Sequence, residues 1–241
     1  MKTFNWYLLL AICLLSQTLE LLAKENSLTH NLTLASDYVF RGESETNNGD
    51  ITSVQFSTTY THVNNWYGGI FIANNKFLSA PKVDYVFAPY LGKSGQLKSW
   101  GYNVFLFHYR YPNDTPLNYT ELWIEIDKQF GASRLKLEIT PTLTDWFGVD
   151  GWSGVNVAVH PSYQLNSRLA ISGAIGHQSL SGDGADGWEH WNLGVNYQFD
   201  KVSLDLRYHD SSVDKNHKVY GDPDSLRIFD HRVVLGLSLS F

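Results

Sequence analysis

A two-residue alternation of apolar and polar side chains recurs along almost the whole chain and limits the fold more than any other feature. In residues 121–130 (ELWIEIDKQF), positions 122, 124 and 126 are aliphatic, whereas positions 121, 125 and 127 are acidic. Because successive side chains of a strand point to opposite faces, this period predicts β-strands with one apolar and one charged face. We count about twelve such segments after residue 24 and no apolar stripe of helical period.

The connections between these segments alternate in length, which predicts an antiparallel up-and-down meander with both chain ends on the side of the short turns. Charged faces opposite apolar ones are typical of a transmembrane barrel, whose apolar residues face lipid and whose polar residues face the lumen. The predicted short turns are 64–65, 93–95, 131–132, 165–166 and 200, and the predicted long loops are 42–51, 74–82, 112–118, 143–153, 178–187 and 210–227.

The predicted fold class is therefore all-β, an antiparallel up-and-down transmembrane β-barrel of about 12 strands. Tyrosine, tryptophan and phenylalanine make up 15% of the chain and gather near strand ends, as in the aromatic girdles of membrane barrels. A soluble β-sandwich also alternates by two, but it hides its apolar face between two sheets. The regular loop alternation, the many charged faces and the apolar-faced last strand ending at Phe241 favour the barrel.

Residues 1–23 are predicted to be a signal peptide, followed by an outer-membrane barrel domain over residues 24–241. Lys2 precedes an apolar stretch at residues 7–16, which is too short to span a bilayer as a helix, and small Ala23 ends a cleavage pattern. A cut after Ser16 is an alternative. The only cysteine, Cys13, lies in this segment, and the preceding Ile12 is unfavourable for a lipidation site. Because a signal peptide implies export, we expect the barrel to lie in the outer membrane of a Gram-negative cell.

The formal charge of −6 argues against a nucleic-acid partner, which requires a basic surface. The acidic segments 181–187 and 209–224 lack the ligand spacing of a calcium loop, so we interpret them as solvated external loops. We expect no cofactor and no metal. The expected partners are outer-membrane lipid and small polar solutes.

Residues 36–46, SDYVFRGESET, resemble the opening signature of the TorF family of bacterial outer-membrane porins. The segments NNWYGGIFIAN, KVDYVFAPYLG and FLFHYRYPND with LNYTELW resemble further family segments in the same order, over nearly all of the mature chain. The resemblance implies a barrel and a passive channel, and it supplies no catalytic residues. The ending GLSLSF resembles the terminal signal read by the outer-membrane assembly machinery, with Phe241 last. Leu239 departs from it, because an aromatic residue is frequent there.

Charges of both signs occupy the predicted inner face. Asp37 and Arg41 share one face of a strand predicted to run through residue 40, with Tyr38 and Phe40 on its lipid side. They lie too far apart to pair with each other, so each is expected to pair with a neighbouring strand. A cluster of His108, Arg110 and Glu121 is predicted across one loop. The candidate pore-lining residues are Asp37, Arg41, His108, Arg110, Glu121, Glu125, Arg134 and Arg207.

Two interpretations of these charges remain open. They line a narrow pore through which small polar solutes diffuse passively, or they form satisfied ion-pair networks in a plugged barrel with a structural or surface-binding role. A third alternative is a barrel lipid hydrolase, for which His177 and Ser179 are the nearest candidate pair. They share one strand face about 7 Å apart, which is too far for a direct hydrogen bond without bending. We expect a protein that is not an enzyme.

Overall fold

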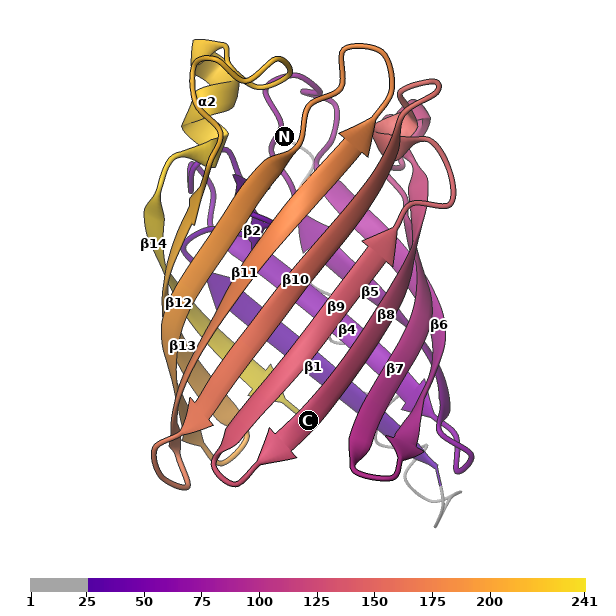
Figure 1. Cartoon of the computed structure of the whole chain (residues 1–241), viewed down its shortest axis with the longest axis vertical. Helices are drawn as coiled ribbons and strands as arrows, with labels where there is room; N and C mark the ends of the chain where they lie inside the picture. The colour runs from indigo at the N-terminus through magenta and orange to yellow at the C-terminus, as the bar shows by residue number, and fades with distance from the viewer. Residues whose placement is uncertain (1–25) are drawn as a thin grey trace, which may run out of the picture.

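Twelve strands form one closed antiparallel barrel in the computed structural model, which describes residues 26–241 (Figure 1). Neighbours in the wall are consecutive in the sequence, and β1 closes the ring against β14. The predicted fold class is confirmed, whereas the predicted signal peptide lies outside the described residues. The wall strands are β1 (Ser27–Ala35), β4 (Ser53–Thr61), β5 (Trp66–Asn74), β6 (Tyr85–Leu97), β7 (Trp100–Tyr109), β8 (Tyr119–Phe130), β9 (Ser133–Pro141), β10 (Ser153–Gln164), β11 (Leu169–Ser181), β12 (Trp188–Phe199), β13 (Val202–Ser211) and β14 (Arg232–Ser240).

Cross-strand pairing shows which face of the wall each side chain occupies. Glu125 on β8 pairs with Glu138 on β9, and the next pair is Ile126 with Leu137. The glutamates point inward, whereas Ile126 and Leu137 point outward and are 42% and 38% exposed. On these strands the predicted apolar outer face and charged inner face are both correct. An outer surface of exposed aliphatic side chains is the kind of surface that lipid covers.

Tight turns join the strands at one end of the barrel, which we call the turn end. Between β6 and β7, β8 and β9, and β12 and β13, only two residues remain, and the first of them, Lys98, Gly131 or Asp200, has a φ of +57°, +61° or +51°. Left-handed residues in two-residue loops match the twist of the strands they join. The turn predicted at 93–95 is wrong, because these residues continue β6 and pair with β7.

Long connections gather at the opposite end, the loop end. They include α2 (Pro223–Phe229) and two short 3-10 helices, Thr115–Leu117 and Trp146–Gly148 (Figure 1). Asp222 caps α2, because its side chain accepts hydrogen bonds from the backbone N–H groups of Asp224 and Ser225. Within residues 26–241, no helix has the length and apolar character needed to cross a membrane.

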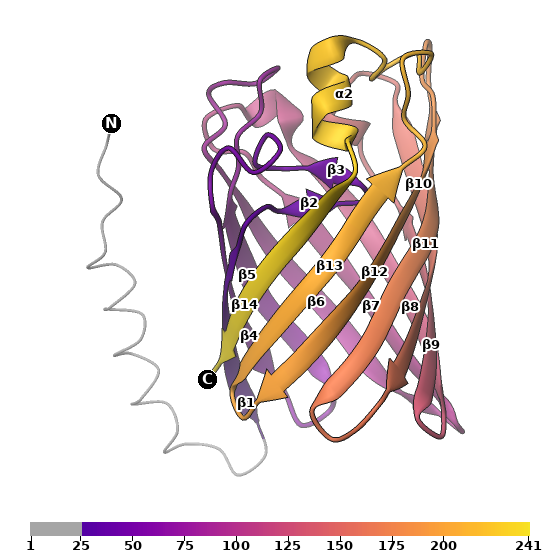
Figure 2. The same ribbon diagram turned by 90° about the vertical axis from the view of Figure 1, so that its left-hand side faces the viewer.

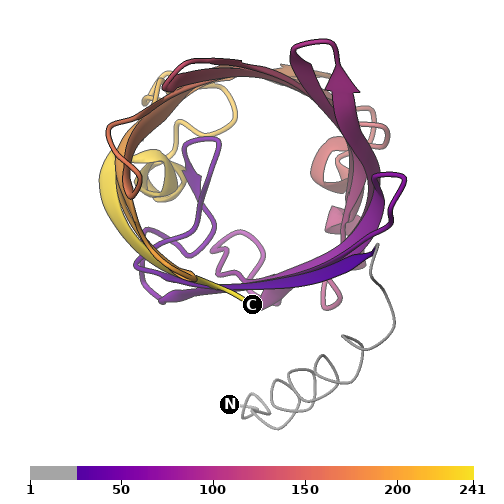
Figure 3. The same cartoon turned by 90° about the horizontal axis from the view of Figure 1, so that it is seen from below.

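The segment after β1 folds into the barrel instead of extending the wall. β1 ends at Ala35, and residues 36–50, which we call the inner hairpin, contain β2 (Val39–Phe40) paired with β3 (Glu43–Ser44). Figures 2 and 3 show this segment inside the ring, toward the loop end. The predictions that Tyr38 and Phe40 face lipid and that residues 42–51 form an external loop are therefore wrong.

Candidate functional site

The tip of the inner hairpin is Arg41–Gly42, the pair at the centre of the SDYVFRGESET segment. Their φ values are +52° and +85°, as a two-residue hairpin turn of this kind requires. A Cβ on Gly42 would lie 3.0 Å from the Cβ of Ser211 and 3.2 Å from that of His190. Both the conformation and the close approach to the wall therefore favour glycine. The Arg-Gly pair produces a tip that crosses the lumen.

Arg41 anchors this tip to the far side of the barrel. Its guanidinium donates to both carboxylate oxygens of Glu121, at 2.7 and 3.1 Å, to Gln178 Oε1 at 3.0 Å and to Thr140 Oγ1 at 2.6 Å. These partners lie on β8, β11 and β9, across the ring from β1. The Arg41 and Glu121 side chains are 4% and 0% exposed. Bidentate pairing of this kind is strongly directional, so it fixes the position of the tip.

A second buried ion pair holds the base of the hairpin. Asp37 accepts hydrogen bonds from Arg232 at 3.0 Å and from Ser44 at 2.7 Å. Arg232 also donates to the carbonyl oxygens of Ile228 and Asp230, at 2.8 and 2.6 Å, at the end of α2. One guanidinium therefore joins the hairpin, β14 and α2. Asp37 and Arg41 do not pair with each other, as predicted. Asp37 pairs with the neighbouring strand β14, whereas Arg41 pairs across the ring, so the prediction of a neighbouring partner is wrong for Arg41.

Two further carboxyl groups lie on the returning half of the hairpin, half-buried Glu43 and buried Glu45. Asn75 donates to Glu45 Oε2 at 2.8 Å. Burial, followed by repulsion from Glu43, raises the pKa of Glu45 well above its ordinary value. Burial also raises the pKa of Glu43 from 4.5 to about 7, against the opposing attraction of Arg232. The hairpin therefore favours the protonated form of both groups.

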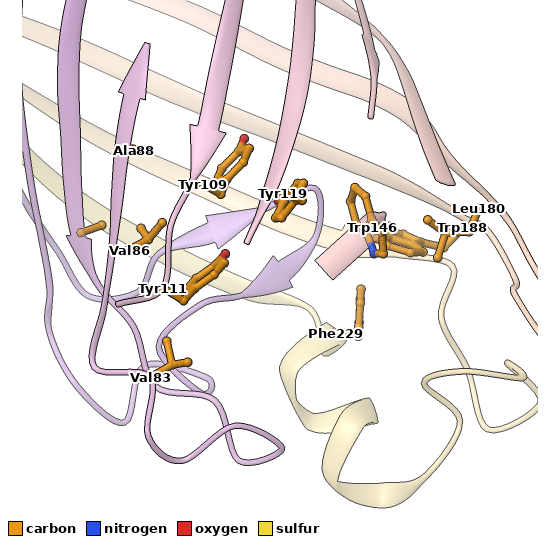
Figure 4. Close-up of a cluster of buried hydrophobic side chains, with 11 residues drawn as sticks. Val83, Val86, Ala88, Tyr109, Tyr111, Tyr119, Trp146, Leu180, Trp188 and Phe229 are labelled. Atoms are coloured by element: carbon orange, nitrogen blue, oxygen red, sulfur yellow. The ribbon is translucent and has the colours of Figure 1, made fainter. Parts of the chain in front are cut away.

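Apolar side chains fill the space around the hairpin at the loop end (Figure 4). The rings of Tyr109 and Tyr119 stack 4.4 Å apart, and Trp188 meets Phe229 of α2 at 5.4 Å. The buried cluster comprises Ala73, Val83, Val86, Ala88, Tyr109, Tyr111, Tyr119, Trp146, Leu180, Trp188 and Phe229. Inward-facing residues on seven wall strands at this level are at most 1% exposed, so the hairpin and cluster close the lumen here; they are Ser53, Ala73, Glu121, Thr140, Asn156, Gln178 and Trp188.

The lumen is open between the hairpin and the turn end. Two cavities of about 810 and 500 Å³ lie there, and both are lined by Glu125 and Arg134. The charged groups pair along the wall: Lys136 with Glu125 at 2.6 Å, Arg134 with Asp127 at 3.0 Å and Arg207 with Asp205 at 2.9 Å. Because these partners lie on the same or adjacent strands, their pairing leaves the centre of the lumen free. We call this region the vestibule.

The structure brings six of the eight candidate pore residues into the lumen. Glu121, Glu125, Arg134 and Arg207 lie on the inner face of the wall, and Asp37 and Arg41 lie on the inner hairpin. His108 and Arg110 do not line the lumen, so their prediction is wrong. His108 shares the outer face with Thr120, to which it is hydrogen-bonded at 2.9 Å, and Arg110 pairs with outward Phe87. Arg41 takes the place predicted for them beside Glu121.

The reason for this error is that β7 is apolar on both faces. Phe105, Phe107 and Tyr109 point inward, whereas Val104 and Leu106 point outward. Together with rings from β5, β6 and β8, they form an inner surface that the sequence reasoning missed; we call it the aromatic wall. Its members are Tyr67, Phe71, Tyr90, Phe105, Phe107, Tyr109 and Trp123. A signal was present in the sequence, because Tyr67 and Tyr90 are each followed two residues later by a glycine, Gly69 and Gly92.

The pair considered for lipid hydrolysis lies on the outer face of β11. His177 and Ser179 pair with outward Val157 and Val155. His177 Nδ1 lies 3.3 Å from Glu189, with both side chains more than half exposed. Within residues 26–241 no hydrogen bond joins His177 to Ser179, so the contact between nucleophile and base is not formed. The same residues contain no group of three or more His, Cys, Asp or Glu side chains that could hold a metal ion.

The strands define a closed twelve-stranded antiparallel barrel whose polar lumen is obstructed at one end. Among solved structures, the KdgM porin matches 88% of this chain and 99% of its own, with a TM-score of 0.60 and 8% identity. The NanC porin matches 89% and 99%, with a TM-score of 0.59 and 9% identity. At such identities the likeness concerns the fold alone.

By sequence, the chain belongs to Gcw_chp, a family described as bacterial proteins of unknown function, whose profile matches residues 23–241. No curated protein matches the chain.

Proposed function

We propose that the protein is an outer-membrane channel for small polar solutes whose outer mouth is closed by the inner hairpin. The observation that carries this proposal is the division of the lumen into two parts. A polar vestibule opens toward the turn end, whereas the inner hairpin and the apolar cluster around it obstruct the loop end. In outer-membrane barrels the short turns face the periplasm and the long loops face outward. Solutes then cross by passive diffusion when the hairpin moves aside.

The way in which the hairpin is attached favours a movable gate over a permanent plug of the lumen. It is a loop joined to the wall at both ends, and its tip is held by polar contacts from one arginine. Buried ion pairs of this kind provide positional specificity, but their net contribution to stability is often small, because desolvation opposes the attraction. A displaced hairpin would expose the polar groups of Glu121, Thr140 and Gln178 to water, beside the rings of the aromatic wall.

The resemblance of residues 36–46 to the TorF signature supports the same proposal, since that signature contains the Arg-Gly tip. We further propose that Phe241 is recognised by the outer-membrane assembly machinery. Its backbone exchanges hydrogen bonds with His30 at 2.8 and 3.0 Å across the closing seam. The runner-up function is a permanently plugged barrel with a structural or surface-binding role.

Planar-bilayer conductance of the refolded protein tests the proposal. We expect rare openings of the complete protein and frequent, reproducible steps when residues 38–46 are replaced by a short glycine-serine linker. A heat-dependent gel shift confirms that both barrels have formed. The matched control replaces residues 182–186, in an external loop, with a linker of the same length and leaves the conductance unchanged. A folded barrel without the hairpin that stays silent would support the plugged-barrel alternative.

Acidic pH is expected to favour the closed state. The pKa values of Glu43 and Glu45 are raised in the closed hairpin, so this state binds more protons than the open one. For Glu43 this stabilisation is complete below pH 4.5 and is lost as the pH rises through about 7, and Glu45 acts in the same direction. Open probability should therefore be higher at pH 8 than at pH 5. The double variant Glu43→Gln/Glu45→Gln should flatten the profile, and a profile that opens on acidification would contradict the assignment.

A further inference from the structure

We propose that the aromatic wall and the vestibule together form a saccharide-binding track. This inference rests on the proposed function, and it names the class of polar solute that the channel takes. It is carried by the way in which the rings lie on the wall, by their continuity along the lumen and by the polar groups beside them.

Two tyrosines lie flat on the inner surface because glycines leave room beneath them. Tyr67 pairs with Gly92, and Gly69 pairs with Tyr90, so each of strands β5 and β6 supplies one ring and one glycine. A Cβ on Gly92 would lie 2.6 Å from Cζ of Tyr67, and one on Gly69 would lie 2.6 Å from Cζ of Tyr90. An aromatic ring placed over a cross-strand glycine shields the backbone with one face. The other face is then available to the lumen.

The rings continue from the vestibule to the hairpin. Tyr67 lies 6.2 Å from Tyr90, Tyr90 stacks on Phe107 at 5.7 Å with an angle of 6°, and Phe107 lies 4.8 Å from Tyr109. Phe105 stacks on Trp123 at 5.4 Å beside this row. These side chains come from four adjacent strands, β5 to β8. A solute bound to one ring can therefore move to the next without leaving the surface.

The hairpin already occupies the outer part of this track. The ring of Tyr38 meets Phe71 at 6.2 Å, and the ring of Phe40 lies 6.1 Å from Tyr109 and 6.4 Å from Trp123. The hairpin thus covers the outer rings with rings of its own. Displacement of the hairpin would expose the aromatic wall from the vestibule to the outer mouth.

Hydrogen-bonding groups border the rings in the larger cavity. Tyr67 donates to Asn103 Oδ1 at 2.6 Å, and the amide of Asn103 donates to Glu125 at 2.8 Å. Gln96 and Arg134 line the same cavity. A cavity of about 810 Å³ falls in the range that encloses small organic ligands.

The combination of flat rings with amide, carboxylate and guanidinium groups matches a saccharide. Its C–H faces carry partial positive charge, which the negative face of an aromatic ring attracts, and its hydroxyl groups donate and accept hydrogen bonds at the edge. A small inorganic ion would make no use of the rings. An apolar aromatic compound would leave the polar groups without partners.

Calorimetric titration of the refolded protein with maltotriose and cellotriose tests the inference, in a detergent without a sugar headgroup. We expect saturable binding and a loss of about tenfold in affinity for Tyr67→Ala. Tyr67→Phe keeps the ring and should retain most of the affinity. Tyr60→Ala removes an outward-facing tyrosine of β4 and should leave binding unchanged. Tyr90→Ala provides a second test if Tyr67→Ala does not yield a heat-modifiable, folded barrel.

Titration measures binding without conduction, so its outcome is separate from that of the conductance experiment. Absence of binding to both saccharides by the hairpin-replaced protein, in which the whole track is exposed, would overturn the inference and leave the channel proposal intact. Binding of equal affinity in wild type, Tyr67→Ala and Tyr90→Ala would also overturn it, because the site would lie elsewhere. Binding of benzoate without binding of either saccharide would show that the solute class is wrong.

Discussion

We expect the Arg41→Met variant to convert a mostly closed barrel into a mostly open one. Removing the guanidinium leaves Glu121 with a buried carboxylate that has lost its bidentate partner. Breaking a buried ion pair by removing one partner costs about 3–5 kcal/mol. This cost falls on the closed state alone, because a displaced hairpin exposes Glu121 to water. The ratio of open to closed channels should then rise by a factor of roughly 10² to 5 × 10³. Single-channel open probability in planar bilayers measures it.

Removing both charges separates the ion pair from the general packing of the hairpin. In the double variant Arg41→Met/Glu121→Leu, no charge remains unpaired, so closure should be largely restored. Arg134→Met is the matched control, because Arg134 pairs with Asp127 in the vestibule, far from the hairpin. It should leave open probability unchanged. A folded Arg41→Met barrel that stays closed would show that the hairpin is held by its apolar contacts and does not act as a gate.

The second large effect is expected at Gly69, where a single methyl group should destabilise the wall. A Cβ at this position would lie 2.1 Å from the carbonyl oxygen of Thr58 and 2.5 Å from the hydroxyl of Tyr90. The first of these atoms belongs to the backbone of β4 and cannot rotate away. We expect Gly69→Ala to lower the free energy of unfolding by about 3 kcal/mol, the upper end for overpacked sites.

The neighbouring glycine supplies the control. Gly68 points outward, and a Cβ there would meet no atom closer than 3.4 Å. Gly68→Ala should therefore change stability by less than about 1 kcal/mol. Urea-induced unfolding in lipid vesicles, followed by tryptophan fluorescence, compares the two variants. Equal stabilities would contradict the close packing of Tyr90 over β5, and with it the geometry of the aromatic wall.

Strands whose two faces differ in chemistry could be predicted from the sequence. On β8, acidic residues alternate with leucine and isoleucine, and on β13 Asp205 and Arg207 alternate with Leu204 and Leu206, so only one assignment of faces buries no charge in lipid. On β7 both faces are apolar, and alternation carried no information about which one faces the lumen. The prediction that His108 and Arg110 face the lumen consequently chose the wrong face of this segment.

The inner hairpin could not be predicted for a different reason. Residues 36–40 continue the alternation of β1, so the local pattern is compatible with a longer wall strand. Contacts with residues remote in sequence hold this segment inside the barrel. Arg41 binds Glu121 and Gln178, which are 80 and 137 residues away. Asp37 binds Arg232, which is 195 residues away. Local periodicity contains nothing about such contacts. The Arg-Gly pair indicated a turn, but not the side of the wall to which it turns.

The place of the hairpin in the chain has a consequence for how the protein is made. The segment leaves the wall directly after the first strand, yet its partners lie on β8, β9, β11, β12 and β14. The last of these exists in its final position only once the final strand has paired with the first. The link from Asp37 to Arg232, and through Arg232 to α2, can therefore form only after the ring has closed, so the base of the hairpin is fixed later than its tip needs to be.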